Sequence, residues 1–183
     1  MVLVSGPVAA GKTSLVRELE RGYGFDRFGT REFILTRLPK TELTRAALQA
    51  AGDQLDAETN GRWVADGLVA RMRESNVPQR FAVDSVRISS QVDAVRAITF
   101  ITAYHVHVTA SLAMLADRYQ QKETDLEELA SYDDVRKHPT EEGVEEMAKR
   151  ADLTIDTTDV TAALAASRVA ALWANTPGKE GFD

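Results

Sequence analysis

The chain has 183 residues, enough for one well-packed domain and rather short for two. Hydrophobic residues make up 44% of it and charged residues 27%, proportions that exclude a disordered chain. The net charge of −6 argues against nucleic-acid binding, and the lack of a long apolar stretch argues against membrane insertion. With no cysteine for disulfides or thiolate metal sites, we expect one cytoplasmic domain whose partners are small molecules.

The first predicted elements alternate between strand and helix. An apolar run at residues 2–4 predicts a strand, and the stretch 14–21 predicts a helix. Residues 25–28 lie just after a glycine-rich break and predict a short second strand. Thr30 is of a residue type that caps helices, so we expect it to cap a helix over 31–38.

The middle of the chain continues this alternation. Apolar and small residues at helical spacing predict helices over 41–55 and 62–72. Residues 81–84 predict a third strand that ends in an acid, and 91–98 predict a helix after it. The run 104–109 predicts the fourth strand.

The last third contains the most charged part of the sequence. A helix is predicted over 111–119, and residues 120–139 then lack a sustained apolar period, which indicates an excursion from the fold. A helix over 140–150, a strand over 153–156 and a helix over 160–173 complete the pattern.

Five strands alternating with helices indicate an α/β fold, with a parallel sheet covered by helices on both faces in three layers. Right-handed crossovers put the carboxyl ends of all the strands at one edge, where ligands bind in such sheets. We expect the domain to span residues 1–175, with a lid at about 120–139 and a frayed tail at 176–183.

Residues 6–13 fit the pattern G-x-x-x-x-G-K-T between the first strand and the first helix, which predicts a P-loop NTPase fold. The two glycines let backbone N–H groups point at phosphate oxygens, and the helix adds its positive end. Lys12 supplies a charge for the β- and γ-phosphates, and Thr13 offers a hydroxyl to Mg²⁺. The predicted ATP-binding loop comprises Gly6, Pro7, Val8, Ala9, Ala10, Gly11, Lys12, Thr13 and Ser14.

Asp84 is the predicted second ligand of the metal. It ends the third strand, and if that strand neighbours the first, its carboxylate lies close to Thr13. A carboxylate in that position can hold Mg²⁺ directly or through water. We therefore expect Thr13 and Asp84 to form the magnesium site.

The segment from Asp84 to Gln91 resembles the nucleoside monophosphate kinases. The adenylate kinase branch carries Asp-Gly-x-Pro-Arg with a Gln four residues after the Arg, and the spacing from Arg87 to Gln91 matches. The spacing from Asp84 to Arg87 is one residue shorter, and the Gly and Pro are missing. The resemblance implies that Arg87 binds the acceptor monophosphate and that Gln91 recognises its base, which favours a purine.

The chain also resembles kinase-like P-loop domains, some of which occur beside adenylosuccinate synthetase-like domains. This resemblance runs over residues 1–173 and rests on the segments Thr30-Arg31-Glu32, Ala47-Leu48-Gln49, Gly61-Arg62-Trp63, Val83-Asp84-Ser85-Val86-Arg87 and Pro139-Thr140-Glu141. It implies phosphoryl transfer.

Arginines are the side chains suited to bringing two anionic nucleotides together, because guanidinium groups bind phosphate oxygens with two parallel hydrogen bonds. Arg31 and Arg87 are candidates for the acceptor phosphate, and Arg37 is a weaker one. Arg118 resembles a lid arginine that closes over the donor phosphates, and Arg136 resembles another. Lys12, Arg87 and Arg118 are the expected catalytic residues.

The sequence thus predicts ATP- and Mg²⁺-dependent phosphoryl transfer to a nucleoside or deoxynucleoside monophosphate. A kinase for another small acceptor, such as dephospho-coenzyme A or a polyol acid, stays open as an alternative. So does a regulatory module that binds nucleotide and hydrolyses it slowly. The choice between ATP and GTP and the oligomeric state are also open at this point.

Two further patterns carry less weight. His105 and His107 alternate on a predicted strand and could form a metal pair, but without a third ligand nearby we expect buried histidines of the sheet. Residues 26–29 match D-x-x-G of a GTPase only as letters, and no N-K-x-D accompanies them. We therefore expect no GTPase switch.

Overall fold

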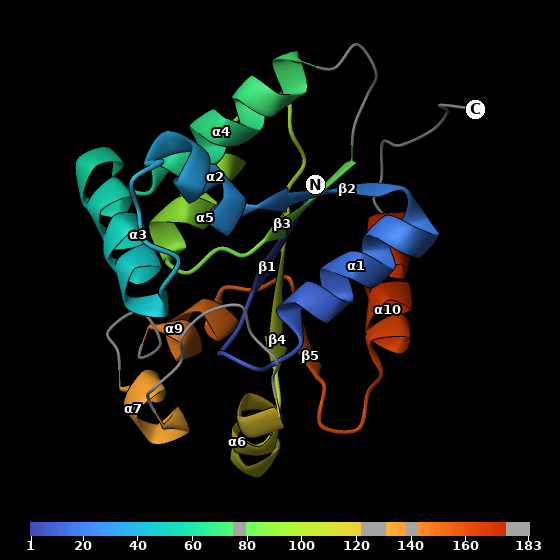
Figure 1. Ribbon diagram of the computed structural model, residues 1–183. Helices are drawn as coiled ribbons and strands as arrows, with labels where there is room; N and C mark the ends of the chain where they lie inside the picture. The colour runs from blue at the N-terminus through green and yellow to red at the C-terminus, as the bar shows by residue number, and fades with distance from the viewer. Residues whose placement is uncertain (75–79, 122–130, 138–142, 175–183) are drawn as a thin grey trace.

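The computed structural model describes residues 1–74, 80–121, 131–137 and 143–174. Its centre is a five-stranded parallel sheet in the order β2-β3-β1-β4-β5, which confirms the predicted α/β fold (Figure 1). The strands are β1 (Val2–Ser5), β2 (Phe25–Gly29), β3 (Arg80–Asp84), β4 (Tyr104–Thr109) and β5 (Leu153–Asp156).

Helices connect the strands and pack on both faces of the sheet, because each parallel connection must cross over it. Figure 1 shows α1 and α10 together on one side of the sheet and α2 to α5 on the other. The described helices are α1 (Lys12–Tyr23), α2 (Thr30–Arg37), α3 (Arg45–Thr59), α4 (Arg62–Arg73), α5 (Ser89–Arg96), α6 (Leu112–Gln121), α7 (Tyr132–Arg136), α9 (Val144–Lys149) and α10 (Ala162–Ala174).

The sheet separates two hydrophobic cores, because successive residues of a strand point to opposite faces. Val2 and Val4 pack with the apolar side chains of α1 and α10, whereas Leu3 packs with those of α4 and α5. All three side chains are completely buried. A nearly continuous apolar strand is the expected pattern for the centre of a parallel sheet.

Local hydrogen bonds explain why α3 and α2 begin at other residues than predicted. α3 begins at Arg45 and not near residue 41, because the Thr44 side chain accepts a hydrogen bond from the Ala47 N–H and caps the helix there. Thr30 is not a cap: Gly29 takes that position, and the Thr30 hydroxyl instead bonds to backbone atoms at the end of β3.

The predicted lid lies mostly outside the described residues, as does the predicted tail at 176–183. Among the described residues of 120–139, the short helix α7 is an element that the sequence pattern did not indicate. Its Tyr132 and Val135 are buried, and the Tyr132 ring lies 5.7 Å from that of Tyr119 on α6. In the described parts of the chain, no helix is both long and apolar enough to cross a membrane.

Candidate active site

The loop between β1 and α1 has a backbone that requires its glycines. Gly6 has a φ of 142°, and a Cβ there would lie 2.1 Å from the carbonyl oxygen of Val108 on β4. Gly11 has a φ of 91° at the N-terminus of α1, where its residue type offers no side-chain cap. The amide groups of the first helical turn are therefore available to an anion.

Lys12 lies at the mouth of this loop. Its Nζ donates hydrogen bonds to the carbonyl oxygens of Gly6 and Pro7, both at 2.7 Å. The ammonium is thus held over the concave side of the loop, where phosphate oxygens bind in P-loop proteins.

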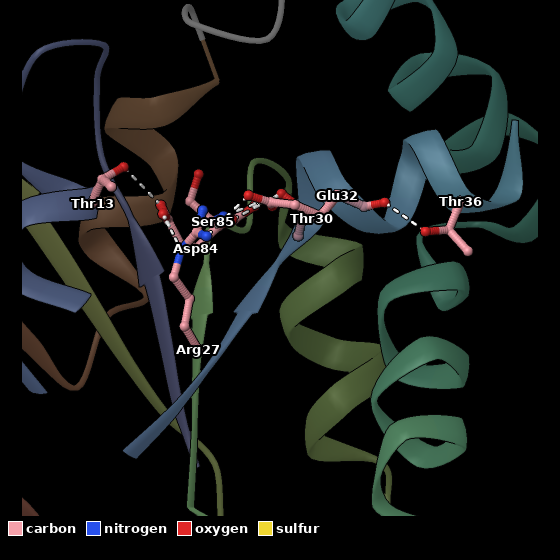
Figure 2. A network of polar contacts seen from close by, with 7 residues as sticks. All are labelled: Thr13, Arg27, Thr30, Glu32, Thr36, Asp84 and Ser85. Carbon is pink, nitrogen blue, oxygen red and sulfur yellow. Dashed lines mark hydrogen bonds and ion pairs between the residues drawn. The ribbon is translucent and has the colours of Figure 1, made fainter. Parts of the chain in front are cut away.

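Asp84 and Thr13 come together as expected, because β3 is the neighbour of β1. The Thr13 hydroxyl donates to Asp84 Oδ1 at 3.3 Å (Figure 2). A hydroxyl and a carboxylate at this separation fit Mg²⁺, which commonly takes one or two protein ligands and fills its octahedron with waters and phosphate oxygens. Among the described residues, no larger cluster of His, Asp or Glu could hold a metal.

Arg27 is a residue of this site that the sequence reasoning missed. Its Nε donates to Asp84 Oδ2 at 3.1 Å, and its Nη1 donates to Glu32 Oε1 at 2.9 Å (Figure 2). Burial alone would lower the pKa of Arg27, but the charges of Asp84 and Glu32 outweigh it and raise the pKa. The guanidinium therefore stays charged and bridges two carboxylates.

The sequence did hold a sign of this role, because Arg27 is a charged residue within a predicted strand of a sheet that we expected helices to cover on both faces. A charged side chain in such a strand needs a partner of opposite charge. In the register of β2 and β3, Arg27 lies opposite Ala82, two positions before the pair of Gly29 and Asp84. Arg27 and Asp84 therefore point to the same face of the sheet, the face that α1 covers.

Thr30 fixes the backbone at the end of β3. Its Oγ1 lies 3.2 Å from the carbonyl oxygens of both Asp84 and Ser85, and it accepts a hydrogen bond from the Ser85 N–H at 3.2 Å. The peptide bond between Asp84 and Ser85 is cis. Neighbouring residues thus hold both the backbone of Asp84 and its carboxylate, and its side chain is only 7% exposed.

One cavity of about 930 Å³ joins the loop to a second region between α2, α3, α4 and α5. It has the size of a small-molecule site. Lys12, Thr13 and Asp84 line the first region, and Asp56, Trp63 and Gln91 line the second. Arginines from several elements surround both regions, namely Arg17, Arg27, Arg31, Arg45, Arg87 and Arg118.

The structure brings most of the predicted arginines into this cavity. Arg31 and Arg87 line it, as does Arg118, whose guanidinium donates to Thr157 Oγ1 at 3.0 Å and to Thr157 O at 2.7 Å. The Thr157 hydroxyl donates in turn to the carbonyl oxygen of Ala10 at 3.0 Å, so Thr157 links Arg118 to the loop of residues 6–13. Arg136 is placed differently, on α7, where its exposed side chain pairs with Asp133 at 3.8 Å.

Gln91 lines the second region but is only 2% exposed. Its Oε1 accepts a hydrogen bond from the Arg87 N–H at 2.8 Å, and its Nε2 donates to both oxygens of Asp56, at 2.9 and 3.1 Å. The Trp63 indole N–H donates to the same carboxylate at 2.6 Å. The sequence analysis assigned neither Asp56 nor Trp63 to the site.

His105 and His107 are buried histidines of the sheet, as predicted. The Ser5 hydroxyl lies 2.7 Å from His105 Nε2 and 2.9 Å from His107 Nδ1. Burial lowers the pKa of each ring to about 4, and for His107 the charges of His105 and Lys12 add to the effect. Both rings are therefore neutral at pH 7, and His107 lies beside Ser5, the last residue before the loop.

No family model matches the sequence, and a comparison with curated proteins finds no match. Solved structures do match along nearly the whole chain. A sugar kinase from a Janibacter species matches with a TM-score of 0.61 and 14% identity over 96% of this chain and 95% of its own. Shikimate kinase from Acinetobacter baumannii, in complex with shikimate, matches with a TM-score of 0.60 and 16% identity over 97% and 94%.

The tunicamycin resistance protein of Deinococcus radiodurans is a third match, with a TM-score of 0.62 and 18% identity over 96% of this chain and 95% of its own. At these identities the likeness concerns the fold. The chain therefore has the α/β fold of the P-loop kinases, with the loop of residues 6–13 at the carboxyl edge of the sheet.

Proposed function

We propose that this protein is a P-loop kinase that transfers a phosphoryl group from ATP, with Mg²⁺, to a small anionic acceptor, a nucleoside monophosphate in the first instance. The observation that carries the proposal is the single cavity, in which the loop residues Lys12 and Thr13 share one space with Arg31 and Arg87. Two anions can be held there side by side.

The donor half of the cavity would hold ATP on the loop. Backbone N–H groups of the loop and the Lys12 ammonium would bind phosphate oxygens, while Thr13 and Asp84 would hold Mg²⁺. Bound ATP and Mg²⁺ supply the phosphoryl group and the neutralising charge for its transfer. Arg118, held by Thr157 beside the loop, adds positive charge on the same side.

The acceptor half would hold the second substrate by its anionic group. Arg87 lies three residues after the end of β3 and Arg31 lies in the first turn of α2, and both line the same cavity as Asp84. Planar guanidinium groups orient a phosphate by paired hydrogen bonds. Catalysis then follows from positioning and charge neutralisation, without a covalent intermediate on the protein.

The experiment is a coupled assay of acceptor-dependent ADP formation with the common ribo- and deoxyribonucleoside monophosphates. We expect at least one monophosphate to stimulate ADP release well above the rate with ATP alone. Binding of ATP without stimulation by any acceptor would contradict the proposal and favour a regulatory nucleotide-binding module.

A kinase of a polyol acid is the second candidate, and Glu32 is the observation that favours it. A hydroxyl acceptor must lose its proton, whereas a monophosphate already carries a nucleophilic oxygen. Glu32 lines the cavity and is held by Arg27 beside Asp84, where it could take that proton. Glu32→Gln should therefore abolish transfer to a hydroxyl acceptor and change transfer to a monophosphate little.

A further inference from the structure

The second region of the cavity is built around one carboxylate. Asp56 comes from the last turns of α3, Trp63 from the start of α4 and Gln91 from the start of α5. The Asp56 carboxylate accepts hydrogen bonds from both of the other side chains. Trp63 is 3% exposed and Gln91 2% exposed, so well-packed groups hold the carboxylate in place.

The amide of Gln91 is committed to the protein. Its oxygen accepts from the Arg87 N–H, and its nitrogen donates to both oxygens of Asp56. A base could pair with this amide only by replacing those bonds. The polar side chain that this group of residues offers to a substrate is therefore the partly exposed carboxylate of Asp56.

This carboxylate has capacity for two further donors, because only two donor nitrogens contact it among the described residues and the Gln91 nitrogen is shared between its two oxygens. Each carboxylate oxygen can accept about two hydrogen bonds. Oδ1 accepts from Trp63 and Gln91, whereas Oδ2 accepts from Gln91 alone among the residues that the structure describes. Burial raises the pKa of Asp56, the nearby charge of Asp53 adds to this, and the hydrogen bonds together with the charge of Arg87 oppose it.

A close backbone contact keeps the three side chains in register. Gly61, at the N-terminus of α4, has a φ of 75°, and a Cβ there would lie 2.6 Å from Ser90 Oγ and 2.8 Å from the Gln91 N. Helices α4 and α5 can approach this closely only because residue 61 is glycine. The contact places Trp63 and Gln91 on either side of the same carboxylate.

We infer that Asp56 is the specificity-determining residue for the acceptor and accepts hydrogen bonds from N–H or O–H donors at the end of the acceptor remote from its anionic group. Gln91 is a positioning residue that fixes Asp56 relative to Arg87. Two sources offer this chemistry: the ring N–H and amino group of guanine, or neighbouring hydroxyls of a polyol acid. The inference rests on the proposed kinase function and refines its acceptor.

The test compares substrates that differ in their hydrogen-bond donors, and it combines them with variants of the Asp56 carboxylate. GMP offers a ring N–H and an amino group, IMP offers the ring N–H alone, and AMP has a ring acceptor in place of that N–H. In the wild type we expect kcat/KM to fall from GMP to IMP by about 10-fold or more, since the Asp56 carboxylate loses one of its hydrogen-bond donors in the closed site. In the polyol arm, a sugar acid is compared with its deoxy analogue in the same way.

Asp56→Asn is the decisive variant, and Asp53→Asn is its matched control. Asp53 lies one turn away on α3, lines the same cavity and carries the same charge. Asp56→Asn should raise the KM of the preferred acceptor by about 10-fold or more and bring the GMP and IMP values together, with the KM of ATP unchanged. Asp53→Asn should preserve the discrimination between acceptors.

Gln91→Ala separates positioning from direct recognition. If Gln91 positions Asp56, the variant loses the discrimination between GMP and IMP, as Asp56→Asn does. If Gln91 itself reads the base, Gln91→Ala changes the choice of base while Asp56→Asn preserves it, and our inference is overturned. Should Asp56→Asn fail to fold, equal kcat/KM values for GMP and IMP in the wild type, and equal values for the sugar acid and its deoxy analogue, overturn it instead.

The two proposals fail in different ways. If no acceptor in either arm stimulates ADP release from the wild type, the kinase function is wrong, and the inference falls with it. If an acceptor is phosphorylated, the kinase function stands. If Asp56→Asn then distinguishes GMP from IMP, or the sugar acid from its deoxy analogue, as strongly as the wild type does, only the role of Asp56 is wrong.

Discussion

At the scale of single residues, the site depends on how the Asp84 carboxylate is neutralised. This side chain is 7% exposed, and a buried charge is costly unless a partner offsets it. Arg27 is that partner in the described structure, at 3.1 Å, and the Thr13 hydroxyl is the other contact. If Asp84 is a metal ligand, Mg²⁺ would take over part of this neutralisation.

Arg27→Met should therefore destabilise the protein by about 1–3 kcal/mol, since it leaves a buried carboxylate without its cation. Urea unfolding with and without Mg²⁺-ATP measures this. We expect the gap between variant and wild type to narrow when Mg²⁺-ATP is present. Arg21→Met is the control, because Arg21 forms an exposed ion pair with Glu18. A gap that Mg²⁺-ATP leaves unchanged would argue against Asp84 as a metal ligand.

Lys12→Ala tests the loop itself. The ammonium lies over the loop carbonyls at the surface of the cavity, so its loss should spare the fold. We expect turnover to fall by about 100-fold or more, because the charge that offsets the transferring phosphoryl group is gone. Circular dichroism, calorimetric ATP binding and ADP release are the measurements. Tight ATP binding with full turnover in the variant would show that the loop is not the donor site.

The pair His105 and His107 predicts how stability depends on pH. Each ring has a pKa lowered to about 4 in the folded protein, against about 6.5 in an unfolded chain. The unfolded chain therefore binds more protons between these values, so stability is full above pH 6.5 and declines as the pH falls. We expect a loss of about 2 kcal/mol for each ring by pH 5.

Urea unfolding between pH 5 and 7.5 measures that decline. The variant His105→Gln/His107→Gln lacks both titrating rings and should show a much flatter profile over this range. Carboxylates titrate mainly below it, so they contribute little to the difference. If the variant loses stability as steeply as the wild type, the two rings are not the cause.

At the scale of elements, the sequence predicted all five strands. The central strands β1 and β3 stand out as apolar runs, whereas the edge strand β2 was indicated mainly by the glycine-rich break before it. The sequence also predicted that Thr13 and Asp84 lie close together, because this requires only that β3 is the neighbour of β1. The ion pair of Arg27 with Asp84 joins residues 57 apart, and the bond from Gln91 to Asp56 joins residues 35 apart. Such contacts depend on how helices and strands pack in three dimensions, which periodicity does not encode.

The junction of β1 with its loop gives a prediction at this scale. Gly6→Ala should destabilise the protein by about 3 kcal/mol or more and abolish ATP binding, because the added Cβ meets the Val108 carbonyl at 2.1 Å and β1 must move away from β4. Gly22→Ala is the matched control: a Cβ at this position in α1 meets nothing within 4 Å among the described residues. It should stabilise the helix by about 0.5–1 kcal/mol. Thermal unfolding and calorimetry compare the two; similar melting temperatures would contradict the steric argument.

At the scale of the whole molecule, the site lies where the layers of the fold meet. The loop proposed to hold the donor connects β1 to α1 on one face of the sheet, while α2, α3, α4 and α5 cover the other face and line the region proposed for the acceptor. The carboxyl ends of β1, β2 and β3 point into the space between them. This arrangement explains why one cavity has two chemically different halves.

The hydrogen bond from the Arg87 N–H to Gln91 has a consequence for the size of the acceptor. It joins the backbone of the arginine proposed to bind the acceptor's anion to the side chain that holds Asp56. If Arg87 and Asp56 bind the two ends of an acceptor as proposed, this hydrogen bond limits how far the two binding groups can move apart. Such a site would select acceptors by their length as well as by the chemistry of their ends.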